Sequence, residues 1–202
     1  SLFRGSKPVM WSTVEKTALA EAEIEYKEHK STAIYVKFPI IKSSDSDLID
    51  ASIVIWTTTP WTIPGNRAIA FGDKINYSLY QVNEVNEDSH LFVNDKIVIA
   101  SELEENFKEK CKISSLSKIK DIKDINSVSC HHPFFEEGYD FEVKIYSGEF
   151  VNLEQGTGFV HIAPGHGADD YELGVKYKID VPETVDANGC LLYTSPSPRD
   201  SD

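Results

Sequence analysis

The sequence predicts a mixed α/β fold that is mainly β, built on a central β-barrel or strongly curved sheet with helices on its outside. Three observations lead to this prediction. Many short apolar runs are bounded by turn residues, few stretches carry helix signals, and 202 residues suit one domain with a sizeable core. Strands are expected at residues 32–40, 51–56, 67–71, 77–82, 91–93, 96–100, 141–146 and 158–162.

Helix signals occur at three places. Segments 12–15 (Ser-Thr-Val-Glu) and 101–104 (Ser-Glu-Leu-Glu) each carry a hydroxyl three residues before a glutamate, which is the capping-box pattern. The first predicts a short helix and the second a helix that runs to about Cys111. A third helix is expected over residues 171–177, and Asn94-Asp95 predicts a hairpin turn between two of the strands.

Three polar stretches are expected to be loops: residues 42–47, 83–89 and 108–123. The third is the local lysine-rich stretch of an acidic chain, with lysines at 108, 110, 112, 118, 120 and 123. Contact with a nucleic-acid backbone is one interpretation of these lysines, and a solvated face is the default one.

Composition predicts a cytoplasmic globular protein. The longest apolar runs are too short to span a membrane, and no signal-peptide pattern opens the chain. Three cysteines without paired spacing predict reduced thiols. The formal net charge of −13 argues against a free-standing nucleic-acid binder, because phosphate contacts recruit basic surfaces.

The first segment that carries chemistry is 56–66, Trp-Thr-Thr-Thr-Pro-Trp-Thr-Ile-Pro-Gly-Asn. Three hydroxyls, on Thr57, Thr58 and Thr59, follow an apolar strand and precede prolines that cannot continue a sheet ladder. Small polar groups are therefore expected at a sheet edge or barrel mouth, although threonine also ends strands for purely structural reasons.

The second such segment is 156–171, where the predicted strand runs into Pro-Gly-His-Gly and then two aspartates. His161, His166, Asp169 and Asp170 cluster around one strand-to-helix turn, and the glycines permit close backbone approach. These side chains are metal-ligand types, but their spacing matches no zinc signature, and no metal is predicted. Cys130, ahead of two histidines and Pro133, is interpreted as a small buried hydrophobe.

Both segments resemble the signature stretches of the editing domain of isoleucyl-tRNA synthetase, a class I enzyme, over about residues 2–189. The corresponding stretch of the valine and leucine enzymes reads Thr-Thr-Arg-Pro, with arginine where Thr59 stands. The resemblance implies a central β-barrel decorated by helices. It also implies that the domain hydrolyses valine wrongly attached to the tRNA for isoleucine, and that its partners are the aminoacylated 3′ end of that tRNA, the valine moiety and the rest of the synthetase.

The resemblance also assigns site residues. The catalytic residues would be Thr57, Thr58, Thr59 and Asp170. The threonines would line the pocket and contact the misplaced side chain, the terminal adenosine and the water, and Asp170 would bind the substrate amine. His161 would exclude isoleucine. Further binding residues are expected at Trp61, Asn66, His166 and Asp169. Trp61 is expected under the pocket or against the terminal adenine. Asn66 is expected at base or ribose edges, with a turn role as the alternative, and Asp169 has helix capping as its alternative.

No nucleophile elbow and no phosphate loop are recognisable, so the expected mechanism is direct attack by water on the aminoacyl ester, assisted by a ribose hydroxyl. A module that binds the tRNA end without hydrolysis and a metal-dependent hydrolase are the alternatives. No cofactor is expected for this chain. ATP and magnesium are implied for the full-length synthetase alone, because the signatures of adenylate formation are absent here.

Three regions are expected along the chain: a lead-in from the catalytic domain at residues 1–12, the editing domain at 13–189, and a tail at 190–202. The tail changes abruptly in character and resembles a translated sequencing adapter, with a genuine Ser/Pro-rich linker as the alternative. It is expected to be non-native or disordered.

Overall fold

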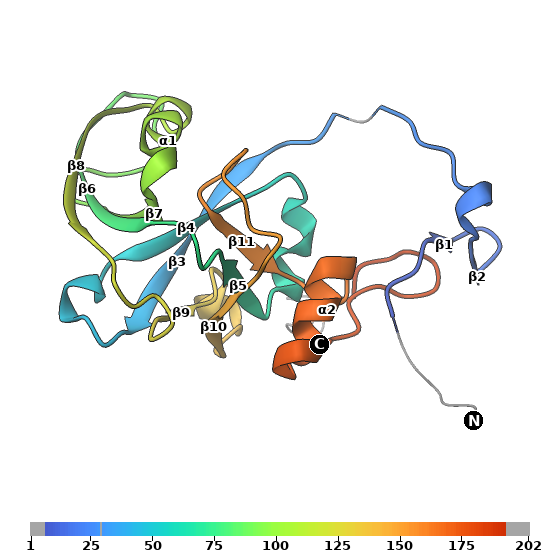
Figure 1. Ribbon diagram of the computed structural model, residues 1–202. Coiled ribbons are helices and arrows are strands. Elements are labelled where there is room, and N and C mark those ends of the chain that lie inside the picture. Colours follow the sequence, from blue (N-terminus) through green and yellow to red (C-terminus); the bar gives the residue numbers. More distant parts are fainter. Residues whose placement is uncertain (1–6, 29, 193–202) are drawn as a thin grey trace, which may run out of the picture.

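The computed structural model describes residues 7–28 and 30–192 (Figure 1). Its strands are β1 (Trp11–Ser12), β2 (Thr17–Ala18), β3 (Ile34–Lys42), β4 (Ser52–Thr57), β5 (Ala68–Phe71), β6 (Tyr77–Val85), β7 (Lys96–Ala100), β8 (Ile113–Asp121), β9 (Ser129–His131), β10 (Glu142–Ser147) and β11 (Phe159–Ile162). Its helices are η1 (Glu21–Glu23), η2 (Ser46–Leu48), η3 (Pro60–Gly65), η4 (Ser101–Leu103), α1 (Glu104–Lys110), η5 (Phe135–Glu137) and α2 (Ala168–Tyr177).

Nine strands form one mixed sheet in the order β11-β5-β10-β9-β3-β4-β7-β6-β8. The pairs β5–β10 and β4–β7 are parallel, and the others are antiparallel. The sheet curves so that its first strand, β11, lies close to β4. Within the described residues the hydrogen-bonded ladder does not close. The mainly β, mixed fold is therefore confirmed, while the closed barrel stays a prediction.

Strand β4 shows why the apolar run 51–56 became a strand buried on both faces. Ile53 and Ile55 are 0 % exposed and pack into the largest core cluster, whereas Val54 points the other way, into the cluster beneath α1 that contains Phe107. Side chains alternate between the faces of a strand, so such a run needs cover on both sides. Burial of each of these side chains contributes about 1.5–3 kcal/mol.

The helix predicted from Ser12 is wrong. The Ser12 hydroxyl does accept the Glu15 N–H at 3.2 Å, as in a cap, but Lys16 takes a left-handed conformation (φ 54°) and the chain turns back as β2. A capping pattern supplies one hydrogen bond, and that bond also fits a tight turn.

Two other secondary-structure predictions need correction, at residues 91–93 and 113–121. The first stretch is not a strand, because Asp95 N donates to Phe92 O in a turn with Asn94 at φ 74°. The lysine-rich loop is instead largely the nine-residue strand β8, which pairs with β6 along its length. Strand β9 was also missed. The helix predicted from Ser101, by contrast, is confirmed by η4 and α1.

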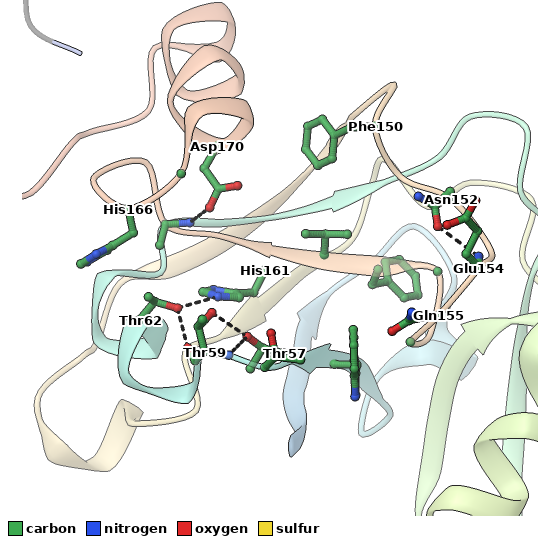
Figure 2. Close-up of a pocket in the computed structure, with 18 of the residues that line it drawn as sticks. Thr57, Thr59, Thr62, Phe150, Asn152, Glu154, Gln155, His161, His166 and Asp170 are labelled. Atoms are coloured by element: carbon green, nitrogen blue, oxygen red, sulfur yellow. Dashed lines mark hydrogen bonds between the residues drawn. The ribbon is translucent and has the colours of Figure 1, made fainter. Parts of the chain in front are cut away.

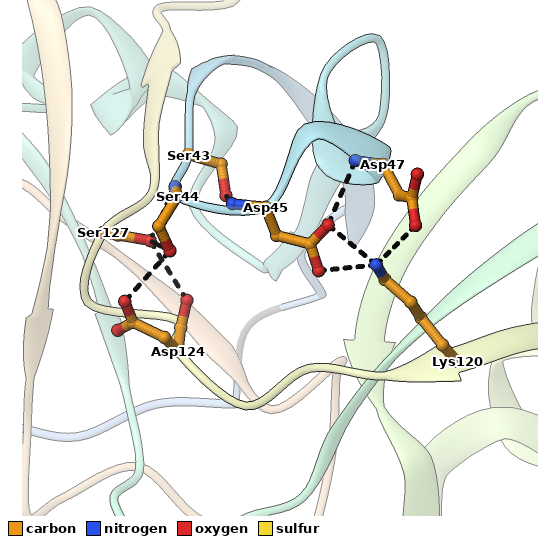
Figure 3. Close-up of polar contacts among 7 residues, drawn as sticks. All are labelled: Ser43, Ser44, Asp45, Asp47, Lys120, Asp124 and Ser127. Carbon is orange, nitrogen blue, oxygen red and sulfur yellow. Dashed lines mark hydrogen bonds and ion pairs between the residues drawn. The ribbon is translucent and has the colours of Figure 1, made fainter.

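Ion pairs engage part of this lysine-rich stretch. Lys120 Nζ lies 2.6 Å from carboxylate oxygens of both Asp45 and Asp47, in the connector between β3 and β4 (Figure 3). Lys112 pairs with Asp88 and Lys118 with Asp121. These exposed pairs favour the solvated-face interpretation, since the lysines concerned already have carboxylate partners.

The two ends of the described chain meet. Trp11 Nε1 donates to Ala187 O at 3.0 Å, and Leu192 N donates to Thr184 O at 2.7 Å beside a bridge between residues 185 and 191. Residues 193–202 of the predicted tail lie outside the described residues. The predicted boundaries at 12 and 189 stay predictions. The longest described helix, α2, has 10 residues, and none of the described helices combines the length and apolarity needed to cross a bilayer.

Candidate functional site

A pocket of about 500 Å³ lies where the ends of β4 and β11 and the start of α2 converge (Figure 2). It brings together the two chemistry-bearing segments, which are about a hundred residues apart in the chain. Its lining residues are Trp56, Thr57, Thr58, Thr59, Trp61, Thr62, Phe150, Asn152, Glu154, Gln155, Gly156, Gly158, Phe159, Val160, His161, Ala163, His166, Gly167 and Asp170.

The threonine triplet forms one rim of this pocket. Thr57 ends β4 and is buried, and its Oγ1 accepts the Thr59 N–H at 3.0 Å and lies 3.2 Å from Thr59 Oγ1. This local bond turns the chain out of the sheet before Pro60, which cannot donate to a ladder. Thr58 and Thr59 are left exposed at the rim.

The short helix η3 follows the rim and presents opposite faces to solvent and core. Trp61 is 51 % exposed and lines the pocket, whereas Thr62 is buried and donates its hydroxyl proton to Thr59 O at 2.8 Å. Asn66, just after the helix, is 0 % exposed and is absent from the pocket lining. Direct contact of Asn66 with a base or ribose does not fit this burial.

His161 comes from β11 and is 7 % exposed. Its Nε2 lies 3.0 Å from Thr62 Oγ1, and its Nδ1 lies 3.4 Å from Asn66 Nδ2. Burial, with smaller effects of the nearby His166 and His132, lowers the pKa of His161 to about 4. The imidazole in the pocket wall is therefore neutral at physiological pH.

Asp170 projects from the first turn of α2 toward the pocket, and its Oδ2 accepts the Ala163 N–H at 2.8 Å (Figure 2). Burial raises the pKa of Asp170 to about 6, and the neighbouring Asp169 adds to this shift. Asp169 itself is exposed and does not line the pocket. Helix α2 has Gly167 as its N-cap, so Asp169 acts on the helix through its charge in the first turn and not as a cap.

His166 closes the pocket between η3 and the segment after α2. Its Nε2 lies 2.6 Å from Thr184 Oγ1, and its ring meets Trp61 edge-on at 5.2 Å between centroids. A Cβ at position 65 would lie 3.0 Å from the His166 ring, so Gly65 is the residue that lets this ring pack against η3. The segment 56–66 thus supports both histidines.

Sequence reasoning missed the opposite wall, made by residues 150–158. Phe150, Asn152, Glu154 and Gln155 line the pocket on that side (Figure 2). Tyr77 anchors the end of this loop, because its Oη donates to Gly158 O at 2.6 Å. The sequence signal was the Gly-Thr-Gly stretch at 156–158, whose first and third residues take φ of +84° and +80°.

No group of three or more His, Cys, Asp or Glu side chains that could hold a metal ion occurs in the described part of the chain. His132 packs in the core instead, where Nε2 donates to Ile63 O at 2.9 Å and burial lowers its pKa to about 4. Cys130 is 0 % exposed in the largest core cluster, as predicted.

Comparison with known proteins gives three results. Residues 29–195 match the family model described as leucyl-tRNA synthetase, editing domain. The chain is 48 % identical over 191 residues to isoleucine–tRNA ligase of Pelagibacter ubique and 44 % identical over 209 residues to that of Rhodopseudomonas palustris; the matches cover 94 % and 97 % of this chain but 21 % of each relative. The chain therefore spans about a fifth of the length of these relatives.

A solved structure, the cytosolic leucyl-tRNA synthetase editing domain of P. knowlesi, shares the fold with a TM-score of 0.53 at 12 % identity, covering 77 % of this chain and 68 % of the other.

Proposed function

Because this chain belongs to the family of synthetase editing domains, in the branch of the isoleucyl-tRNA synthetases, we propose that its pocket hydrolyses valine wrongly esterified to the tRNA for isoleucine. One observation carries this proposal: a hydroxyl rim, a buried carboxylate and a neutral imidazole wall line the same cavity. An aminoacyl ester needs contacts of these three kinds, for the water and oxyanion, the ammonium, and the side chain.

Asp170 is the proposed anchor for the α-ammonium of the substrate. Its carboxylate is largely buried, and its pKa of about 6 leaves it charged at pH 7. An ammonium that binds beside it replaces lost hydration with a charge-assisted hydrogen bond. The N–H of Ala163 fixes one carboxylate oxygen at 2.8 Å, so the other oxygen remains for the substrate.

The threonine rim is the proposed site of water attack. Thr58 and Thr59 expose hydroxyls that can orient a water and donate to the developing oxyanion. Water adds to the ester carbonyl, the bond to the ribose oxygen breaks, and that oxygen takes the proton, assisted by the neighbouring ribose hydroxyl. The products are free valine and uncharged tRNA, with no covalent intermediate on the protein.

His161 is the proposed wall that rejects isoleucine. The pocket as a whole is far larger than one aliphatic side chain, so discrimination needs a rigid local contact rather than limited total volume. The synthetic site alone distinguishes isoleucine from valine only about 150-fold, a known value for this class of enzyme, so a second site must supply the remainder. Forcing an additional methylene against a rigid wall costs roughly 1–3 kcal/mol.

The other predicted binding residues take different places in this proposal. Trp61 has an exposed ring suited to stack on the terminal adenine, with His166 against its edge. Asn66 acts through His161 and not on the substrate. Asp169 contributes negative charge at the start of α2, and this charge raises the pKa of Asp170.

The proposal extends to the setting of the domain. The 3′ end of the tRNA and the rest of the synthetase are its partners, in the cytoplasm, and the reaction needs no cofactor, since ATP and magnesium serve amino-acid activation elsewhere in the enzyme. The predicted barrel is part of the same proposal, with β11 against β4 as its seam.

The decisive experiment compares hydrolysis of valyl and isoleucyl esters of the same tRNA by this chain, with and without EDTA. We expect preferential release of valine that EDTA does not change. Loss of activity in EDTA would favour the metal-dependent alternative. Tight binding of valyl-tRNA without release of valine would favour the binding-module alternative.

A further inference from the structure

The buried side chains behind His161 form one hydrogen-bonded chain whose two ends are backbone carbonyls. Thr62 Oγ1 lies 2.8 Å from Thr59 O, and Asn66 Nδ2 lies 2.8 Å from Ala68 O. His161 bridges the two, with Nε2 at 3.0 Å from the Thr62 hydroxyl and Nδ1 at 3.4 Å from the Asn66 amide nitrogen.

The Thr59 carbonyl determines where the proton lies on one side of the ring. A carbonyl oxygen only accepts, so the Thr62 hydroxyl must donate its single proton to Thr59 O. The Thr62 oxygen can then only accept from His161, which requires a proton on Nε2.

The Ala68 carbonyl leads independently to the same tautomer. It must face the amide nitrogen of Asn66, because the amide oxygen in that place would set two acceptors against each other. The second N–H of that amide is then directed at His161 Nδ1, which must be the unprotonated nitrogen. A proton on Nδ1, whether in the other tautomer or in the imidazolium, would set two donors against each other.

Rigidity follows from this arrangement. Thr62 is 5 % exposed, Asn66 0 % and His161 7 %, so water does not replace a broken bond in this chain. Rotation of the ring would leave a buried donor and a buried acceptor without partners, which is unfavourable. The ring is therefore held in one orientation, as an uncharged apolar surface toward the pocket.

We propose that Thr62 and Asn66 are positioning residues for selectivity: they hold His161 as the Nε2-protonated neutral tautomer, in the one ring orientation that rejects the longer aliphatic side chain. This inference rests on the proposed function, in which His161 forms the wall against isoleucine. Asn66 does not line the pocket, and Thr62, which does, holds the ring through its buried hydroxyl.

The tautomer is tested without tRNA. Long-range ¹H–¹⁵N correlation on ¹⁵N-histidine-labelled chain, with His161 assigned by loss of its signals in His161→Gln, should show a pyrrole-type Nε2 and a pyridine-type Nδ1. Thr62→Ser should keep this pattern. Thr62→Val keeps the shape but removes the acceptor that faces Nε2, so the His161 Nε2 signal should shift, while Asn66 still favours the same tautomer. Thr184→Val removes a hydroxyl from the other pocket imidazole and should leave the His161 signals unchanged. A protonated Nδ1 in the unmodified chain, or unchanged His161 signals in Thr62→Val, would overturn the inference.

Selectivity supplies the second readout. Thr62→Val should raise the ratio of isoleucyl to valyl ester hydrolysis on the order of tenfold, because loss of a buried hydrogen-bond partner shifts an equilibrium by about this factor. Thr62→Ser should restore the original ratio. An unchanged ratio in a folded Thr62→Val chain would refute the positioning role. If the unmodified chain hydrolysed neither ester, the proposed function would fail, while the ¹⁵N spectrum would still decide the tautomer.

Discussion

Replacement of Asp170 by asparagine separates an ammonium anchor from a structural residue. Asparagine has nearly the same size and retains an oxygen that can accept the Ala163 N–H, which lies 2.8 Å from Asp170 Oδ2. The change removes only the negative charge. It therefore removes the proposed attraction for the substrate, which should lower kcat/KM. It also removes the cost of burying a carboxylate, which should raise the free energy of unfolding.

The magnitude of each effect follows from the site. Loss of a charge-assisted hydrogen bond to the ammonium should cost about 1.5–3 kcal/mol in the transition state, or roughly 10- to 150-fold in kcat/KM. Burial raises the pKa of Asp170 from its ordinary value of 3.8 to about 6. The native state thus binds this proton more tightly than the unfolded chain, so stability falls as pH rises from about 4 to about 6. At pH 7 the penalty is on the order of 1–3 kcal/mol, and Asp170→Asn should recover it.

The assay measures valyl ester hydrolysis between about pH 5 and pH 8, together with urea unfolding at pH 7. In the unmodified chain kcat/KM should rise with pH through about 6, because only the carboxylate pairs with the ammonium. Asp170→Asn should be slow, should lose this pH step, and should unfold at higher urea concentration. Hydrolysis at the unmodified rate would refute the anchor. A variant that is both inactive and less stable would show that Asp170 has a structural role instead.

Three further predictions concern the wall, the loop and the chain end. His161→Ala should admit isoleucyl ester, with a rise in isoleucine release larger than the fall in valine release; unchanged rejection in the folded variant would exclude a steric role. Gly158→Ala should lower the free energy of unfolding by about 2 kcal/mol or more, because the φ of residue 158 is +80° and the new Cβ would lie 2.5 Å from the Cβ of Ala100. Thermal melts measure this loss, and a melt unchanged within error would show that the site accepts a Cβ without strain. Truncation after Gly189 should change the free energy of unfolding by about 1 kcal/mol or less, since Cys190 and Leu192 are exposed, Leu191 is half-buried, and the backbone bonds lost are those of Cys190 to Asp186 and of Leu192 to Thr184. Unfolding of the shortened chain would place the tail inside the domain.

Strand prediction worked where an apolar run is buried by neighbours on both sides. The run at 96–100 became β7 at the expected bounds, and the run at 51–56 became β4 shifted by one residue. It failed at β8, whose lysines and serines look like a loop in isolation. That strand exists because the long edge of β6 offers unpaired backbone groups, and this edge arises from tertiary pairing and not from local composition.

In the candidate site too, some features follow from local sequence and others from tertiary contacts. Residue types marked the two segments as unlike core strands, because hydroxyls, imidazoles and carboxylates stand there beside prolines and glycines. The individual roles of the threonines, His161 and Asp170 came from the resemblance to the editing domain. For the opposite wall at 150–158, the Gly-Thr-Gly stretch was the one signal, and it did not indicate that Phe150, Asn152, Glu154 and Gln155 line the pocket. These side chains line the pocket because Tyr77, about eighty residues earlier, holds the backbone carbonyl of Gly158.

Residue types, their local spacing and the resemblance they carry identify the family, predict a mainly β architecture and mark the two segments that form the pocket. The place of each side chain in the site comes from the tertiary structure. It buried Asn66 behind His161, left Asp169 in solvent while enclosing Asp170, and aligned the carbonyls of Thr59 and Ala68 that set the proton on the imidazole. Hydrogen-bond direction and desolvation depend on atoms distant in the chain, and neither is encoded by the identity of a residue and its immediate neighbours.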